Sequence, residues 1–144
     1  MSEYKLEKYG VCSVPQFLSQ SEIQEYLQQS HSNKWYNHKS TVSGKVSALH
    51  FLPTTYKSYE RVALMKMEPH AIQDWHVDGT RSCVVIHPLS ENYANGMTEH
   101  GEYEGPVLLD VRRRHAVFNN EYTRICLQIG FDKGAVETWH SLKL

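Results

Sequence analysis

A histidine and an aspartate lie one residue apart in the segment QDWHVDGTRSCVVIHPL, residues 73–89. In an extended strand, side chains two positions apart point to the same side, so His76 and Asp78 can approach one cation together. A neutral imidazole and a carboxylate are ligands that suit a divalent transition metal. Because ionisable groups beside an apolar run are costly when they are unpaired, we expect partners for them elsewhere in the chain.

His115 is the best candidate for a third ligand. It follows the segment GPVLLDVRRR and begins the strand-like segment HAVFNN, and hairpin pairing with the preceding run would return it toward the site. Two histidines and one carboxylate form a facial triad that leaves three metal positions open. Arg124 begins the apolar segment RICLQIGF. An arginine that points inward there would need an anionic partner such as a dicarboxylate.

Each of these residues also has a simpler explanation. Residues 76–79 could form an Asp-Gly β-turn, His115 could flank a strand, and Arg124 could pair with an exposed glutamate. The order and spacing of these residues within a series of predicted strands favour the metal site over these separate explanations.

The elements that must position these residues are mainly β-strands. Short segments rich in Val, Ile, Leu and aromatic residues alternate with Pro, Gly, Asn and Asp, a pattern typical of strands. They lie at residues 46–52, 61–68, 81–89, 105–111, 115–120 and 123–131. Many short strands without interleaved helices favour an all-β fold of antiparallel sheets, either a sandwich or an open barrel.

One helix is predicted within residues 17–33. Ser19 and Glu22 have the spacing of a capping box, in which each side chain accepts a hydrogen bond from the other residue's backbone. Leu18 and Ile23 have the spacing of a hydrophobic staple across the same helix start.

The polar segment 90–106 connects two predicted strands. We expect it to be a hairpin tip or a loop over the mouth of a site, with Asn95-Gly96 as its turn.

The composition indicates one globular domain that spans residues 1–144 with a single core. The formal charge of −1 gives no sign of a nucleic-acid partner, and no apolar stretch approaches the roughly 20 residues of a membrane span. The N-terminus lacks the apolar centre of a signal peptide. Cys12, Cys83 and Cys126 are widely spaced and odd in number, which predicts reduced, buried thiols in a cytoplasmic protein.

The order HVD, then HAVFN, then the arginine of TRICLQIGF resembles the iron(II)- and 2-oxoglutarate-dependent oxygenases, and within them the aspartyl/asparaginyl β-hydroxylase type. The resemblance covers residues 65–131, about half of the chain. It implies a double-stranded β-helix, or jelly roll, of the cupin kind. It also implies that His76, Asp78 and His115 bind Fe(II) and that Arg124 pairs with the distal carboxylate of 2-oxoglutarate.

The resemblance implies a further role for His87. It lies eleven residues after His76, where this type of oxygenase places a second histidine near the co-substrate. The residues alone leave open a second interpretation, in which His87 is a hydrogen-bonded core residue. Asn119 matches the asparagine of the HxVxN pattern, and we expect a structural role for it.

The activity implied by the resemblance is a dioxygenase reaction with Fe(II), 2-oxoglutarate and O2. A substrate is hydroxylated while 2-oxoglutarate is decarboxylated to succinate, with no catalytic residue expected beyond the metal ligands. A small molecule or a protein side chain is the expected substrate, and the sequence does not determine the oligomeric state. Trp35, Tyr36 and Arg114 are candidate substrate contacts. Trp35 and Tyr36 could instead cap the core, and the three consecutive arginines at 112–114 could face solvent.

Two other classes of protein stay open. A cupin-type metalloprotein, such as an isomerase or a dioxygenase that does not use 2-oxoglutarate, would leave Arg124 without a co-substrate. A non-catalytic jelly-roll binding module would use His76 and Asp78 for a structural metal or for none.

Overall fold

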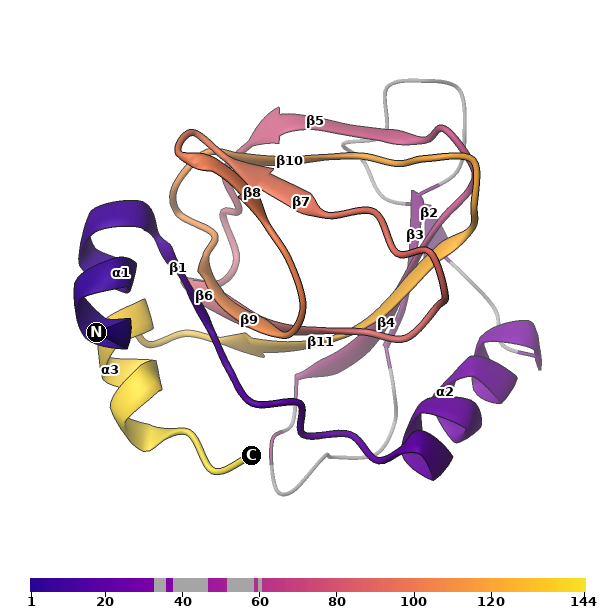
Figure 1. Cartoon of the computed structure of the whole chain (residues 1–144), viewed down its shortest axis with the longest axis horizontal. Helices are drawn as coiled ribbons and strands as arrows, with labels where there is room; N and C mark the ends of the chain where they lie inside the picture. The colour runs from indigo at the N-terminus through magenta and orange to yellow at the C-terminus, as the bar shows by residue number, and fades with distance from the viewer. Residues whose placement is uncertain (33–35, 38–46, 52–58, 60) are drawn as a thin grey trace.

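Two antiparallel β-sheets face each other and make up most of the structure (Figure 1). The computed structural model describes residues 1–32, 36–37, 47–51, 59 and 61–144. The seven-stranded sheet has the order β1 (Val11–Ser13), β9 (Val107–Asp110), β6 (Cys83–Pro88), β11 (Arg124–Phe131), β4 (Val62–Met67), β3 (Ser47–Phe51) and β2 (Tyr36–Asn37). The four-stranded sheet has the order β5 (Ile72–His76), β10 (His115–Phe118), β7 (Gly96–Thr98) and β8 (Gly101–Tyr103). This arrangement is a jelly roll, as predicted.

The helices of the described residues pack against the large sheet, on the face that points away from the small sheet (Figure 1). The described residues form α1 (Ser2–Tyr9), α2 (Gln20–Ser32) and α3 (Ala135–Ser141). None of these helices is long and apolar enough to cross a membrane. The predicted helix is α2, whereas α1 and α3 were not predicted from the sequence.

The start of α2 confirms the predicted capping box. The backbone N–H of Ser19 donates to Glu22 Oε1 at 2.9 Å, and the N–H of Glu22 donates to Ser19 Oγ at 3.2 Å. Leu18 and Ile23 are both buried against the large sheet, as a hydrophobic staple requires. The two hydrogen bonds define where α2 begins. The contacts of Leu18 and Ile23 hold the helix against the large sheet.

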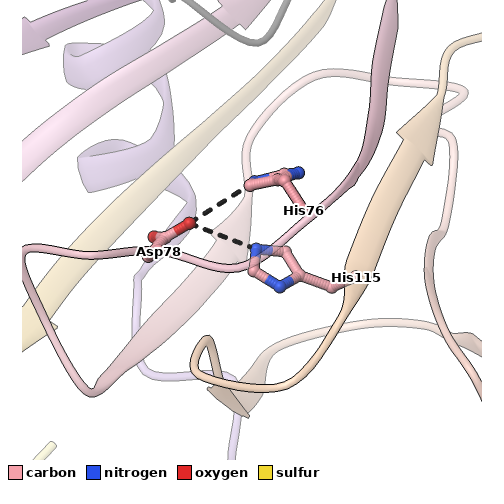
Figure 2. Close-up of side chains that lie close together, drawn as sticks. All are labelled: His76, Asp78 and His115. Atoms are coloured by element: carbon pink, nitrogen blue, oxygen red, sulfur yellow. Dashed lines mark ion pairs between the residues drawn. The ribbon is translucent and has the colours of Figure 1, made fainter.

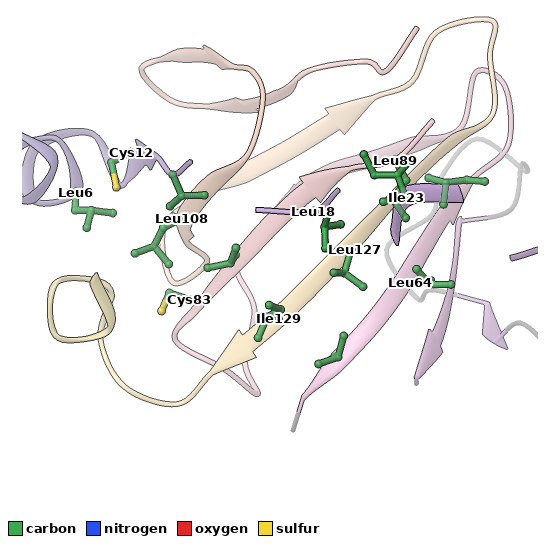
Figure 3. Close-up of a cluster of buried hydrophobic side chains, with 14 residues drawn as sticks. Leu6, Cys12, Leu18, Ile23, Leu64, Cys83, Leu89, Leu108, Leu127 and Ile129 are labelled. Carbon is green, nitrogen blue, oxygen red and sulfur yellow. The ribbon is translucent and has the colours of Figure 1, made fainter. Parts of the chain in front are cut away.

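Strand alternation divides the buried side chains into two cores. The helix-side core lies between the helices and the large sheet and includes Leu6, Leu108, Leu127 and Ile129 (Figure 3). The inter-sheet core lies between the two sheets and contains Met65, Met67, Val84, Ile86, Leu109 and Val117. Cys12, Cys83 and Cys126 are free and buried in these cores, as expected. The large sheet therefore buries both of its faces.

All six predicted strand segments contain a strand, but their connections differ from the prediction in one place that matters for the site. The predicted hairpin between β9 and β10 is wrong, because β9 pairs with β1 and β6 while β10 pairs with β5 and β7. Residues 111–114 carry the chain from the large sheet to the small one. His115 therefore starts a strand on the opposite wall of the fold.

The segment 90–106 forms a hairpin of β7 and β8, but its predicted turn at Asn95-Gly96 is wrong. Gly96 begins β7 and pairs with Tyr103, and the chain reverses at residues 99–100 instead. A Cβ at Gly96 would overlap the Tyr103 hydroxyl group. The glycine therefore serves the close approach of an aromatic ring instead of a turn.

Asn119 ties the β10–β11 connection to the end of β4. Its side chain is 8% exposed, and Nδ2 donates to the carbonyls of Glu68 and Tyr122, each at 2.9 Å. Replacing Asn119 by alanine leaves two carbonyls without this donor, so we expect the free energy of unfolding to fall by about 1–3 kcal/mol in urea titrations. The exposed Glu121→Ala variant in the same connection should change it by less than about 0.5 kcal/mol. Equal stabilities of the two variants would contradict the structural role.

Candidate metal centre

Three side chains from two separate parts of the sequence converge between the sheets (Figure 2). His76 is the last residue of β5, Asp78 follows two residues later, and His115 is the first residue of β10. Asp78 Oδ1 lies 3.4 Å from His76 Nε2 and 3.5 Å from His115 Nε2. The three potential ligand atoms all lie within 4.8 Å of one another, a spacing that fits one metal ion.

A β-bulge in β5 directs His76 toward this point. β10 pairs with β5 at His115↔His76 and then at Val117↔Gln73, so three steps along β5 match two along β10. The extra residue lies at Asp74–Trp75, where the N–H of Trp75 donates to Asp74 Oδ1 at 2.8 Å. Such a bulge re-aims the side chains that follow it, and here Gln73 and His76 both line the same cavity.

Asp78 reaches the site from just beyond the strand. The prediction that His76 and Asp78 project together is confirmed, although β5 ends at His76. The N–H of Asp78 donates to the carbonyl of Val111 at 2.8 Å. This bond holds the residue against the segment that crosses between the sheets and leads to His115.

Hydrogen bonds set the tautomer of both histidines. His76 Nδ1 lies 2.6 Å from the carbonyl oxygen of Asp74, and His115 Nδ1 lies 2.8 Å from that of Arg113. A carbonyl can only accept, so Nδ1 carries the hydrogen in each ring. In a neutral ring Nε2 then has its lone pair free, and metal-binding histidines are oriented in this way.

The ionisation of the group also suits a cation. Burial opposes the charge on Asp78, but hydrogen bonds from His115 and His76 and the nearby Arg81 outweigh it and lower the pKa of the Asp78 carboxyl far below its usual range. The hydrogen bond with Asp78 raises the pKa of His76, against the effect of burial. A proton on His76 Nε2 and a metal ion compete for the same place, so binding of a divalent cation would release that proton.

Both sheets line the cavity that contains these three side chains. It holds about 430 Å³ of empty space, including its opening to solvent. The polar part of its wall includes His76, Asp78, Arg81, His115, Arg124 and Gln128, and aliphatic side chains such as Val84, Ile86 and Leu109 make up much of the rest. The cavity therefore combines a polar centre with an apolar wall.

Arg124 points into this cavity and is 2% exposed, so its predicted inward orientation is confirmed. Its Nε donates to the carbonyl of Ala94 at 2.9 Å, and its guanidinium carbon lies 4.1 Å from the centroid of the Tyr93 ring. Among the residues that the structure describes, no carboxylate forms an ion pair with it. A buried guanidinium without a counter-anion is costly, and an anion bound in the cavity would relieve that cost.

His87 does not lie with this group. Ile86 lines the cavity, and strand alternation turns the next residue of β6 to the helix side, where the His87 ring packs edge-on against Phe17 at 4.9 Å between centroids. Its Nδ1 lies 2.7 Å from the carbonyl oxygen of Pro88. The suggested contact of His87 with a co-substrate in this cavity is therefore corrected, and His87 takes the core position that the sequence had left open.

The candidate substrate contacts lie elsewhere or are not described. Arg114 is exposed, with its guanidinium carbon 5.9 Å from the Trp75 ring centroid, and it is not part of the cavity wall. Trp35 lies outside the described residues, and Tyr36 is described only as part of β2.

Arg81 contacts a candidate metal ligand and was not predicted from the sequence as a site residue. Its Nε lies 3.0 Å from Asp78 Oδ2, and its Nη2 donates to Gln128 Oε1 at 3.1 Å. The signal was present in the sequence, because Arg81 precedes a buried strand just as Arg124 begins one. Like Arg124, Arg81 needs an anionic partner if it points inward.

No family model and no curated protein sequence matches the chain. Among solved structures, a prolyl hydroxylase from Trichoplax adhaerens, in complex with a hypoxia-inducible-factor peptide fragment, superposes with a TM-score of 0.70 at 14% identity and covers 100% of this chain and 91% of its own. A 2OG-Fe(II) oxygenase family oxidoreductase from Burkholderia pseudomallei gives 0.67 at 9% identity, with coverages of 94% and 92%. A Pseudomonas putida prolyl-4-hydroxylase gives 0.66 at 12% identity, with coverages of 92% and 98%.

At these identities the likeness establishes the fold. This chain shares the fold of the three neighbours, of which two are prolyl hydroxylases and one is a 2OG-Fe(II) oxygenase family oxidoreductase. None of the three is described as an aspartyl/asparaginyl β-hydroxylase, so that finer resemblance stays a prediction.

The triad geometry predicts binding of a divalent transition metal. Removing one imidazole by His115→Ala should lower the affinity for Co(II) in isothermal titration calorimetry by more than the roughly 10–100-fold that loss of a ligand's hydrogen-bond partner typically costs. The exposed His100→Ala variant provides the matched control and should bind as the unchanged protein does. Equal Co(II) affinities of the two variants would argue against the triad.

The raised pKa of His76 predicts a specific response to loss of its partner. In protein kept free of metal by a chelator, Asp78→Asn should lower the pKa of His76, because the hydrogen bond and charge of Asp78 raise it while burial and the Arg81 charge lower it. The measurement is an NMR titration of the His76 ring protons. The Glu25→Gln variant, altered at an exposed position of α2, should leave the titration unchanged. An unchanged His76 midpoint in Asp78→Asn would contradict the assigned cause.

Proposed function

We propose that this protein is an iron(II)- and 2-oxoglutarate-dependent dioxygenase that hydroxylates a substrate and converts 2-oxoglutarate to succinate. One observation carries the proposal. A His-Asp-His group with metal-binding geometry lines the same cavity as a buried arginine that pairs with no carboxylate of the described residues. A metal and an anionic co-substrate would satisfy both features at once.

The donor set fits Fe(II). His76 Nε2, Asp78 Oδ1 and His115 Nε2 would hold the ion, and the carbonyls that accept from the two Nδ1 atoms keep both rings in the required orientation. Two imidazoles and one carboxylate with open positions are typical of non-haem iron oxygenases. Sites built for structural zinc instead close all four positions with protein ligands.

The co-substrate site fits a dicarboxylate. Arg124 has guanidinium donors that face the cavity and can bind one carboxylate bidentately. The other end of 2-oxoglutarate carries a keto group and a carboxylate, which suit the open metal positions. Tyr103 also lines this cavity, and burial raises the pKa of its phenol to about 12, so its hydroxyl remains a hydrogen-bond donor at neutral pH.

When bound, iron and 2-oxoglutarate supply the oxidising chemistry that places an oxygen atom of O2 in a C–H bond. The chain itself fixes three ligand atoms and leaves three metal positions free. Arg124 neutralises and orients the distal carboxylate. The aliphatic wall around Val84, Ile86 and Leu109 keeps bulk water away from the reacting groups.

A protein side chain or a small molecule is the proposed substrate, acted on by a single domain formed by residues 1–144. The Trichoplax neighbour was solved with a bound peptide, which supports a peptide side chain as the first class to test. Peptide libraries screened for substrate-stimulated succinate formation would identify it.

A spectroscopic experiment without O2 tests the co-substrate site directly. Fe(II) and 2-oxoglutarate added to the protein should produce the weak visible charge-transfer band of the chelate. Arg124→Met should raise the 2-oxoglutarate concentration at half-maximal band by about 10–100-fold, since a hydrogen bond to a charged group contributes about 1.5–3 kcal/mol. Metal affinity should change little in this variant, because Arg124 contacts none of the three ligands.

The same titration separates the other classes. Asp78→Ala should show no band and no 2-oxoglutarate-coupled succinate formation. Metal binding without a band in the unchanged protein would favour a cupin-type metalloprotein of another activity. Absence of metal binding would favour a non-catalytic binding module.

A further inference from the structure

The two carboxylate oxygens of Asp78 have different partners. Oδ1 faces His76 Nε2 and His115 Nε2, as the two dashed lines that meet at one oxygen show in Figure 2. Oδ2 points the other way and lies 3.0 Å from Arg81 Nε. The carboxylate thus presents one oxygen to the histidines and one to a guanidinium.

Arg81 is itself held in place by β11. Its Nη2 donates to Gln128 Oε1 at 3.1 Å, and Gln128 is 6% exposed. The amide of Gln128 is oriented in turn, because its Nε2 contacts Met65 Sδ at 3.1 Å. Arg81 therefore bridges Asp78 and a buried side chain of the large sheet.

Gly130 gives this arginine room on the same strand. A Cβ at Gly130 would lie 3.2 Å from Arg81 Cδ, closer than most such contacts. Two positions of β11 thus accommodate the observed conformation of Arg81. Gln128 does so through a hydrogen bond, and Gly130 does so through the absence of a side chain. A guanidinium that merely paired with a surface carboxylate would not need either feature.

We propose that Arg81 is a positioning residue that makes Asp78 a one-oxygen ligand. It holds Oδ2 in a charge-assisted hydrogen bond, so that a metal ion binds Oδ1 alone. For Oδ2 to turn toward the metal, Asp78 would have to leave Arg81 partly buried without its carboxylate partner, which is unfavourable. The proposal rests on the metal site proposed above.

Binding through one oxygen of Asp78 determines how many positions of the metal stay open. Three protein atoms leave three positions of an octahedral ion free, whereas a carboxylate that binds through both oxygens would take one of them. A bidentate co-substrate and one further ligand need all three. Arg81 would thus preserve the coordination capacity of the site without touching the metal.

Water-proton relaxation of the Mn(II)-loaded protein tests the proposal without turnover or co-substrate. Mn(II) held by three protein atoms carries three exchangeable waters. In Arg81→Met, Oδ2 is released and replaces one water, so the relaxivity per bound Mn(II) should fall by about one third. Arg61→Met is the matched control, because Arg61 also flanks β11 but pairs with Asp132 and the Thr80 carbonyl. Its relaxivity should equal that of the unchanged protein.

A second variant covers the case in which Arg81→Met does not fold. Gln128→Leu keeps the side-chain volume but removes the oxygen that holds Arg81, and its relaxivity should fall in the same direction. Unchanged relaxivity in the folded Arg81 variant, or in Gln128→Leu if only that variant folds, overturns the proposal while leaving the metal site intact. If the unchanged protein binds no Mn(II), the proposed metal site itself fails, and the role of Arg81 with it.

Discussion

The register between β10 and β5 is the constraint on which the rest of the site depends. It places His115 opposite His76, and the bulge at Asp74–Trp75 lets Gln73 and His76 face the same cavity. The bulge also presents the Asp74 carbonyl that binds His76 Nδ1. A regular strand would turn either Gln73 or His76 to the outside, because alternate residues face opposite sides of a sheet. The geometry of the candidate metal site therefore depends on one irregular strand pair.

Charge balance in the cavity is the second organising feature. Among the described residues of its wall, Asp78, Arg81 and Arg124 are the charged side chains when the histidines are neutral, so cations exceed anions in this set. Arg81 is paired with Asp78, whereas Arg124 contacts the Ala94 carbonyl, the Tyr93 ring and Met67 Sδ, and no carboxylate of the described residues pairs with it. A divalent cation and a dicarboxylate together bring no net charge. They would fill the metal position and neutralise Arg124 while leaving the overall balance of the cavity unchanged.

The large sheet connects stability with the site. In β11, Ile125, Leu127 and Ile129 pack into the helix-side core, while Arg124 and Gln128 face the cavity from the other side of the same strand. The helices bury one face of the large sheet, and the small sheet with its candidate ligand side chains covers the other face. Packing of the helices thereby holds rigid the strand that carries Arg124 and supports Arg81. Sites built on such strands are positioned more sharply than sites on loops.

Local patterns in the sequence predicted six of the strands, the capped helix α2 and the candidate site residues His76, Asp78, His115 and Arg124, because alternation, capping and residue type act over a few neighbouring positions. Only the tertiary structure decided that β10 lies opposite β5 and not beside β9. It also decided that His87 faces the helices and that Arg81 holds the second oxygen of Asp78. These features depend on strand register and on contacts between segments far apart in the chain, which no local pattern contains.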